Sequence, residues 1–110
     1  MGADHLKLMD EAVTVPSAAT RAIGEACKRA RSVVSVGINE REGGTLYNTH
    51  LLFDADGTLI QRRRKMTPTY HDRMILGTGG PSGLRAVSSA VGQIGQLACW
   101  EHYNPLTCYC

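Results

Sequence analysis

The sequence predicts a mixed α/β fold, and three observations lead to that prediction. Apolar residues recur at helical spacing over about residues 17–31. Short β-branched or alternating runs, typical of strands, follow this segment. The order along the chain is a helix, a strand, a hairpin, a long connection and two more strands, with no repeat or linker. This order favours a sheet that carries its helix on one face and needs a further layer on the other.

The helix is predicted to begin after Pro16, with Ser17 as its N-cap. Its apolar stripe faces away from a basic and acidic side, so the helix is amphipathic. Cys27 lies on the stripe and is expected to pack in the core. The stripe consists of Ala19, Ile23, Ala26, Cys27 and Ala30.

The strands are predicted from three regions of the chain. A β-branched run over 33–38, ended by the polar segment NEREGG, indicates a buried strand. TLYNTHLLF and TLIQRRR surround a turn at 54–57 and form a hairpin, in which Gly57 takes a positive φ. After a long connection over 66–83, LRAVSS and QIGQLAC indicate two more strands, and Cys99 closes the second.

Composition is that of a folded domain without a strong charge. Hydrophobic residues make up 43% and charged residues 20% of the chain, and the net charge is +2. No apolar run approaches the roughly 20 residues of a membrane helix, and the start has no apolar signal core. We therefore expect a cytoplasmic protein with neither nucleic acid nor membrane as a partner.

The basic run from Arg62 to Lys65 is interpreted as a solvated strand end. A phosphate-binding patch is the alternative, but neither interleaved aromatic residues nor a second basic cluster accompanies the run.

The four cysteines contain no C-x-x-C pair and no following histidine pair, so we expect no structural zinc site. Without a secretory signal the thiols are expected to be reduced. These residues are Cys27, Cys99, Cys108 and Cys110.

The segment LACWEHYNPL around Cys99 is the strongest candidate for chemistry. A cysteine at the end of a strand, followed by a sharp turn, is how hydrolytic enzymes expose a nucleophile and aim backbone N–H groups at developing negative charge. A buried structural thiol is the alternative. A nucleophilic thiolate needs a nearby cation, and Lys65 is the candidate, although a solvated charge is the more common explanation of a single lysine.

These segments together resemble the nitrilase branch of the carbon–nitrogen hydrolase superfamily. Lys65 lies in RRRKMTPTYHDR and Cys99 lies in QLACWEHYNPL, with GLRAVSSAVGQIGQ between them and GGTLYNTHLLFDADGTLIQ before them. The resemblance runs from about Glu11 to Leu106. Two motifs in the right order, joined by matching sequence, make the resemblance specific.

The resemblance implies a four-layer α-β-β-α sandwich and a Glu–Lys–Cys triad. Lys65 is then its lysine and Cys99 its nucleophile. Asp72 stands where many members have a second acidic residue, usually Glu, and the backbone N–H of Trp100 would help to polarise the bound intermediate. No metal or organic cofactor is implied.

One part of the family's pattern is absent. The triad glutamate normally lies upstream in a motif like F-P-E, and no such motif occurs here; the upstream glutamates match non-catalytic regions. The match also fades over 107–110. We therefore expect residues 1–110 to be a partial carbon–nitrogen hydrolase domain that lacks the N-terminal strand region and the C-terminal half.

The implied activity is hydrolysis of a small-molecule nitrile to the carboxylic acid and ammonia, through a cysteine thioimidate and an acyl-enzyme. The alternatives are an amidase of the same superfamily and a non-catalytic truncated fragment. The resemblance also implies a homo-oligomer built from dimers, which in nitrilases often extend into spirals.

Overall fold

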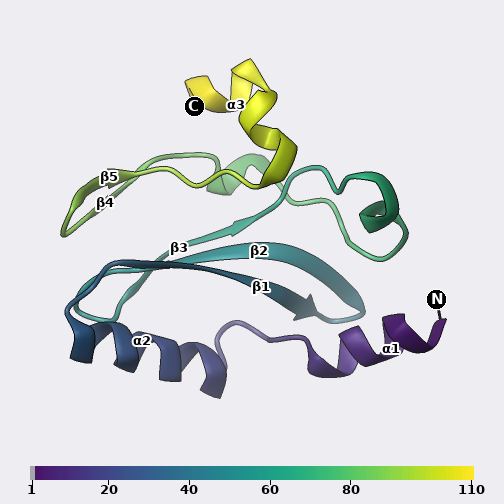
Figure 1. Cartoon of the computed structure of the whole chain (residues 1–110), viewed down its shortest axis with the longest axis horizontal. Helices are drawn as coiled ribbons and strands as arrows, with labels where there is room; N and C mark the ends of the chain where they lie inside the picture. Colours follow the sequence, from purple (N-terminus) through teal and green to yellow (C-terminus); the bar gives the residue numbers. More distant parts are fainter. Residues whose placement is uncertain (1) are drawn as a thin grey trace.

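A three-stranded antiparallel sheet, β1–β2–β3, divides the molecule into two sides in the computed structural model, which describes residues 2–110. The helices α1 and α2 lie on one side, and the later part of the chain covers the other (Figure 1). In chain order the elements are α1 (Gly2–Glu11), α2 (Ala18–Ala30), β1 (Val34–Glu42), β2 (Thr45–Phe53), β3 (Leu59–Arg64), the 3₁₀ helices η1 (Tyr70–Met74) and η2 (Pro81–Gly83), β4 (Val87–Ser89), β5 (Gly92–Ile94), η3 (Cys99–Tyr103) and α3 (Pro105–Tyr109).

The helix predicted over 17–31 is confirmed as α2. Ser17 caps it in a capping box with Thr20, and Arg31 ends it in the left-handed conformation. Cys27 is buried against Leu51 and other apolar residues of β2, as expected. The short helix α1 was not predicted, and none of its described residues is buried.

The sheet extends further than the sequence pattern indicates. The strand predicted over 33–38 continues to Glu42, because the turn at 43–44 folds the chain back and pairs Glu42 with Thr45. The prediction that NEREGG ends the strand is wrong. The hairpin at 54–57 is confirmed, and Gly57 has a φ of 88°.

On the opposite side, the last two strands are much shorter than predicted. β4 and β5 have three residues each and form a separate hairpin. The chain then leaves the hairpin, and the Gln96 side chain donates to Gln61 of β3 at 2.9 Å. Cys99 therefore does not close a strand, as was predicted, but begins η3.

The part of the chain that the structure describes, residues 2–110, contains no helix with the length and apolar character needed to cross a bilayer.

Candidate active site

The basic run at the end of β3 is divided between the two faces of the sheet. Successive side chains of a strand point to opposite faces. Arg63 and Lys65 are buried on the face that η3 covers, whereas Arg62 and Arg64 point to the α2 side and remain partly exposed. The interpretation of the run as a solvated strand end is therefore wrong for Arg63 and Lys65.

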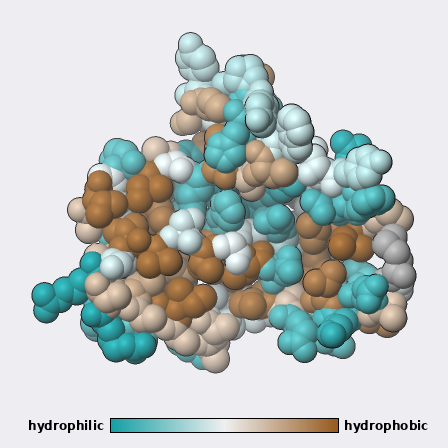
Figure 2. All heavy atoms as spheres, in the orientation of Figure 1, coloured by the Kyte–Doolittle hydropathy of each residue, from teal (hydrophilic) through white to brown (hydrophobic). Residues whose placement is uncertain are grey.

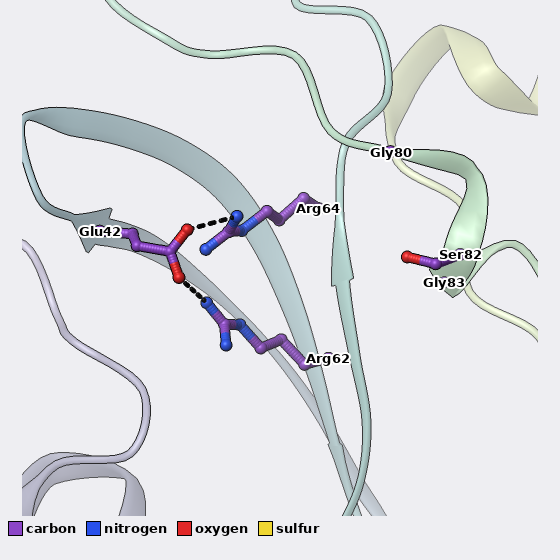
Figure 3. Close-up of a pocket in the computed structure, with 6 residues that line it drawn as sticks. All are labelled: Glu42, Arg62, Arg64, Gly80, Ser82 and Gly83. Carbon is purple, nitrogen blue, oxygen red and sulfur yellow. Dashed lines mark hydrogen bonds and ion pairs between the residues drawn. The ribbon is translucent and has the colours of Figure 1, made fainter.

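On the α2 side, Arg62 and Arg64 are neutralised by two glutamates. Both arginines bond to the buried carboxylate of Glu40 and to the exposed carboxylate of Glu42. Figure 3 shows Glu42 between the two guanidinium groups at a pocket completed by Gly80, Ser82 and Gly83. Because the positive charges are matched, this pocket offers no support for a phosphate site.

Glu40 is fully buried beneath this pair of arginines. Burial alone would raise the pKa of its carboxyl, but hydrogen bonds from Arg64, Thr49 and Arg62 outweigh burial and lower the pKa to about 2. The carboxylate is therefore charged over the whole physiological pH range and stabilises this end of the sheet.

Lys65 is the first residue after β3 and is held on both sides by backbone hydrogen bonds. Its N–H donates to Asn48 at 2.8 Å, and its carbonyl oxygen accepts from the Gly79 N–H at 2.9 Å. A Cβ atom at Gly79 would come within 2.7 Å of that carbonyl oxygen, so glycine is required there. The position of the lysine backbone is thus fixed by two neighbouring segments.

The ammonium group of Lys65 lies among polar partners from a single turn. The side chain is only 3% exposed. Its Nζ donates to Thr69 Oγ1 at 2.8 Å and pairs with Asp72 Oδ2 at 3.4 Å. The backbone N–H of Asp72 donates to the carbonyl of Thr69 at 3.0 Å, which holds both partners in one turn. The structure therefore brings together Lys65 and Asp72.

Cys99 is the first residue of η3, the second turn of the site. It is exposed, and its backbone is strained. Its φ is 55°, in the left-handed region that non-glycine residues adopt at a cost of about 1–2 kcal/mol. Tyr70 has a φ of 52° and begins η1, the turn that carries Asp72. Among the described residues, Arg31 at the end of α2 is the third non-glycine residue with a positive φ, and the other two begin the turns that carry Cys99 and Asp72. Strain of this kind is common at functional sites.

Trp100 follows Cys99 in the first turn of η3. The N–H groups of a first turn have no partner within the helix, so the Trp100 N–H is free of helical hydrogen bonding. Its side chain is 63% exposed and contacts the ring of Tyr103 at a tilt of 40°, with ring centroids 4.8 Å apart.

Glu101 was not among the residues predicted for the site, yet its carboxylate connects the two motifs. Glu101 Oε1 accepts from the N–H of Met66, the neighbour of Lys65, at 2.8 Å. Glu101 Oε2 accepts from the N–H of Ala98, the neighbour of Cys99, also at 2.8 Å. An acidic residue two positions after the candidate nucleophile was visible in the sequence, but its partners were not.

The same carboxylate forms a buried ion pair with Arg63, at 2.7 Å. Burial by itself raises the pKa of Glu101, but the bonds from Arg63 and from the two backbone N–H groups outweigh burial and hold that pKa below its usual range. Glu101 is therefore ionised and has both oxygens occupied.

The family model for carbon–nitrogen hydrolases matches residues 1–110 of this chain. The chain therefore belongs to the carbon–nitrogen hydrolase family. A crystal structure of a carbon–nitrogen hydrolase from Helicobacter pylori G27 superposes with a TM-score of 0.74 over 83% of this chain and 32% of that chain, at 20% identity. The predicted fold class, part of an α-β-β-α sandwich, is confirmed.

Curated relatives with higher identity are named as nitrilases. "Nitrilase 3" from an unknown prokaryotic organism is 71% identical over 108 residues, which are 98% of this chain and 33% of that protein. A "Nitrilase" from Paraburkholderia phymatum is 51% identical over 98% of this chain and 32% of that protein. An "Aliphatic nitrilase" from Rhodococcus rhodochrous is 39% identical over 91% of this chain. The chain spans about a third of the length of the first two relatives.

Proposed function

We propose that this chain carries the nucleophile and the lysine of a nitrilase that converts a small nitrile and two waters to a carboxylic acid and ammonia. The observation that supports this most is the connection between the two motifs. One buried carboxylate bonds to the backbone beside Lys65 and to the backbone beside Cys99. The high identity to proteins named nitrilases favours this branch of the family.

The residues divide the chemistry between them. Cys99 Sγ bonds to the nitrile carbon, one carbon–nitrogen π bond breaks, and the nitrogen takes a proton, which gives a thioimidate. A first water adds to this carbon and ammonia leaves as a thioester remains. A second water then breaks the carbon–sulfur bond and releases the acid.

Lys65, Asp72 and Trp100 support these steps. The ammonium of Lys65 stabilises negative charge as it develops at the reacting centre, and the Trp100 N–H donates to the same centre. Asp72 holds the ammonium in place through the ion pair at 3.4 Å. The general base for the thiol and for water is a glutamate outside these 110 residues.

We also propose that residues 1–110 form the middle part of a larger domain. Three buried polar atoms on the site face, His50 Nδ1, Arg63 Nε and Arg63 Nη2, have no hydrogen-bond partner within residues 2–110. Native proteins satisfy nearly all buried polar groups. Further protein or water at this face would supply the partners.

A chimera tests the function: these residues replace the matching 108-residue segment of the 71% identical relative. We expect the chimera to release ammonia from nitriles, and Cys99→Ala to lower that rate by about 10⁴-fold or more. Cys27→Ala, a buried thiol in the core, is the control and retains turnover. Full activity in Cys99→Ala would refute the assignment.

A comparison of two substrates distinguishes the proposed nitrilase from the amidase alternative. The chimera is offered a nitrile and the amide of the same acid, and the proposed nitrilase turns over the nitrile faster. A preference for the amide would assign the chain to the amidases of the superfamily.

A further inference from the structure

Glu101 has no role in the proposed reaction, yet it is the most completely bonded carboxylate on the site face. It is 8% exposed, and its two oxygens accept three hydrogen bonds. The donors come from the Arg63 side chain, from the backbone after Lys65 and from the backbone before Cys99. No other described carboxylate bonds to both motifs.

The backbone of Glu101 also holds the turn that contains Cys99. Its N–H donates to the Ala98 carbonyl at 3.1 Å, and its carbonyl accepts from Thr107 Oγ1 at 2.7 Å. A residue with a φ of 55° persists only where its surroundings fix it. Glu101 bonds to the residue immediately before Cys99 through both its side chain and its backbone, and so restrains the strained position.

The environment argues against Glu101 as the general base. A base must have a free oxygen toward the proton it accepts. Both oxygens of Glu101 are already bonded, and the pKa of its carboxyl is lowered by those bonds, which makes it a weak base. The arrangement fits a group that positions others.

We propose that Glu101, held by Arg63, is a positioning residue that sets the distance and direction between the Cys99 thiolate and the Lys65 ammonium. This inference rests on the proposed function. A buried ion pair contributes little to stability relative to apolar residues of the same size, so its value here lies in geometry. Displacement of a reacting group by about 1 Å can cost about 10²-fold in rate.

The test compares Glu101→Gln with Glu42→Gln in the chimera. Both changes remove a carboxylate that pairs with an arginine of β3, but Glu42 lies on the other face of the sheet. We expect Glu101→Gln to lower kcat about 100-fold with KM changed less than about threefold. Glu42→Gln should change kcat less than about twofold. Glu101→Asp, which keeps the charge, should recover about tenfold of the loss.

A second measurement does not depend on turnover. The rate at which iodoacetamide alkylates Cys99 is followed by mass spectrometry of the Cys99 peptide. We expect it to fall about tenfold in Glu101→Gln, because the Lys65 ammonium no longer stabilises the thiolate from a fixed position. Far-UV circular dichroism and the urea midpoint establish that each variant is folded. The kcat of each variant is divided by the fraction of molecules in which iodoacetamide labels Cys99. Where Glu101→Gln does not fold, the same comparison is made with Glu101→Asp.

The outcomes separate the two proposals. If the chimera hydrolyses nitriles and a folded Glu101→Gln matches Glu42→Gln in kcat and alkylation, the positioning role is wrong and the function stands. If the unsubstituted chimera releases no ammonia, the function fails, and the alkylation rates alone decide whether Glu101 positions Cys99.

Discussion

At the scale of single residues, two buried charges, Lys65 and Glu40, lie on opposite faces of the sheet. Lys65 is 3% exposed and lies beside Asp72, whereas Glu40 is fully buried beneath two arginines on the other face. Both are charged groups without much water around them. Each therefore depends on its protein partners, and each gives a prediction.

Lys65→Ala in the chimera is expected to lower kcat about 10³-fold, because no positioned cation then stabilises the negative charge that develops at the reacting centre. Lys65→Arg should not restore the rate, since a planar guanidinium does not replace a compact ammonium. Ammonia release measures both variants. Activity near that of the unsubstituted chimera in Lys65→Arg would show that only charge matters at this position.

The pKa of Glu40, lowered from 4.5 to about 2, predicts a loss of stability in acid. A depressed folded-state pKa gives stability that is present above pH 4.5 and is lost as pH falls toward 2. The full shift corresponds to about 3 kcal/mol, of which about 2 kcal/mol is lost between pH 6 and pH 3. Urea unfolding of the chimera at pH 6 and pH 3 measures the loss, and Glu40→Gln should show a smaller difference. Equal pH dependence in both proteins would contradict the prediction.

At the scale of elements, successive side chains at the end of β3 point to opposite faces of the sheet, so the run of four basic residues is divided between two sets of partners. Arg63 pairs with Glu101 on the site face, and Arg62 pairs with Glu40 and Glu42 on the α2 face. The α2-face partners Glu40 and Glu42 lie on β1, whereas the site-face partner Glu101 lies in η3. A strand with a period of two therefore connects the helix layer to the site.

This arrangement predicts that neighbouring arginines differ in importance. Arg63→Ala leaves the Glu101 carboxylate buried without its cation and should destabilise the chimera by about 3–5 kcal/mol. Arg62→Ala should cost about 1 kcal/mol, because Glu40 keeps Arg64 and Thr49 as partners. Urea denaturation of the two variants checks this, and similar midpoints would argue against a division of the run between faces.

At the scale of the whole molecule, the chain forms a thin slab. Its extents are 41 × 36 × 18 Å, and its radius of gyration of 14.5 Å exceeds the roughly 13 Å of a compact domain of this length. Figure 2 shows hydrophobic side chains at the surface over the region of the β4–β5 hairpin and the sheet. Large exposed apolar or aromatic side chains also occur in η1, η3 and α3: Tyr70, Met74, Trp100, Tyr103, Leu106 and Tyr109.

These surfaces predict the behaviour of the 110-residue chain alone. It should elute from a sizing column as an oligomer or aggregate, because exposed apolar patches favour association. It should also release no ammonia from nitriles, because the proposed reaction needs a general base that we place outside these residues. A monodisperse monomer with multiple turnovers would contradict both the proposal of an external base and the proposal that these residues are part of a larger domain.

The sequence by itself determined one helix, one turn and one core position, together with the two motifs. The helix after Ser17, the turn at Gly57 and the core position of Cys27 follow from periodicity and turn chemistry, which act between near neighbours. The motifs around Lys65 and Cys99 are identified by their resemblance to the nitrilase branch, because spacing alone does not pair the two residues. The resemblance they carry also gave the correct family and fold class.

Only the tertiary structure decided how these parts meet. Glu101 and Arg63 are 38 residues apart, and their pairing depends on how η3 packs on the sheet. The short β5 and the left-handed backbone of Cys99 arise in the same way, since residues 95–98 leave their hairpin and lie over the sheet. Local propensity does not predict such contacts, because their free energy comes from side chains that only the folded chain brings together.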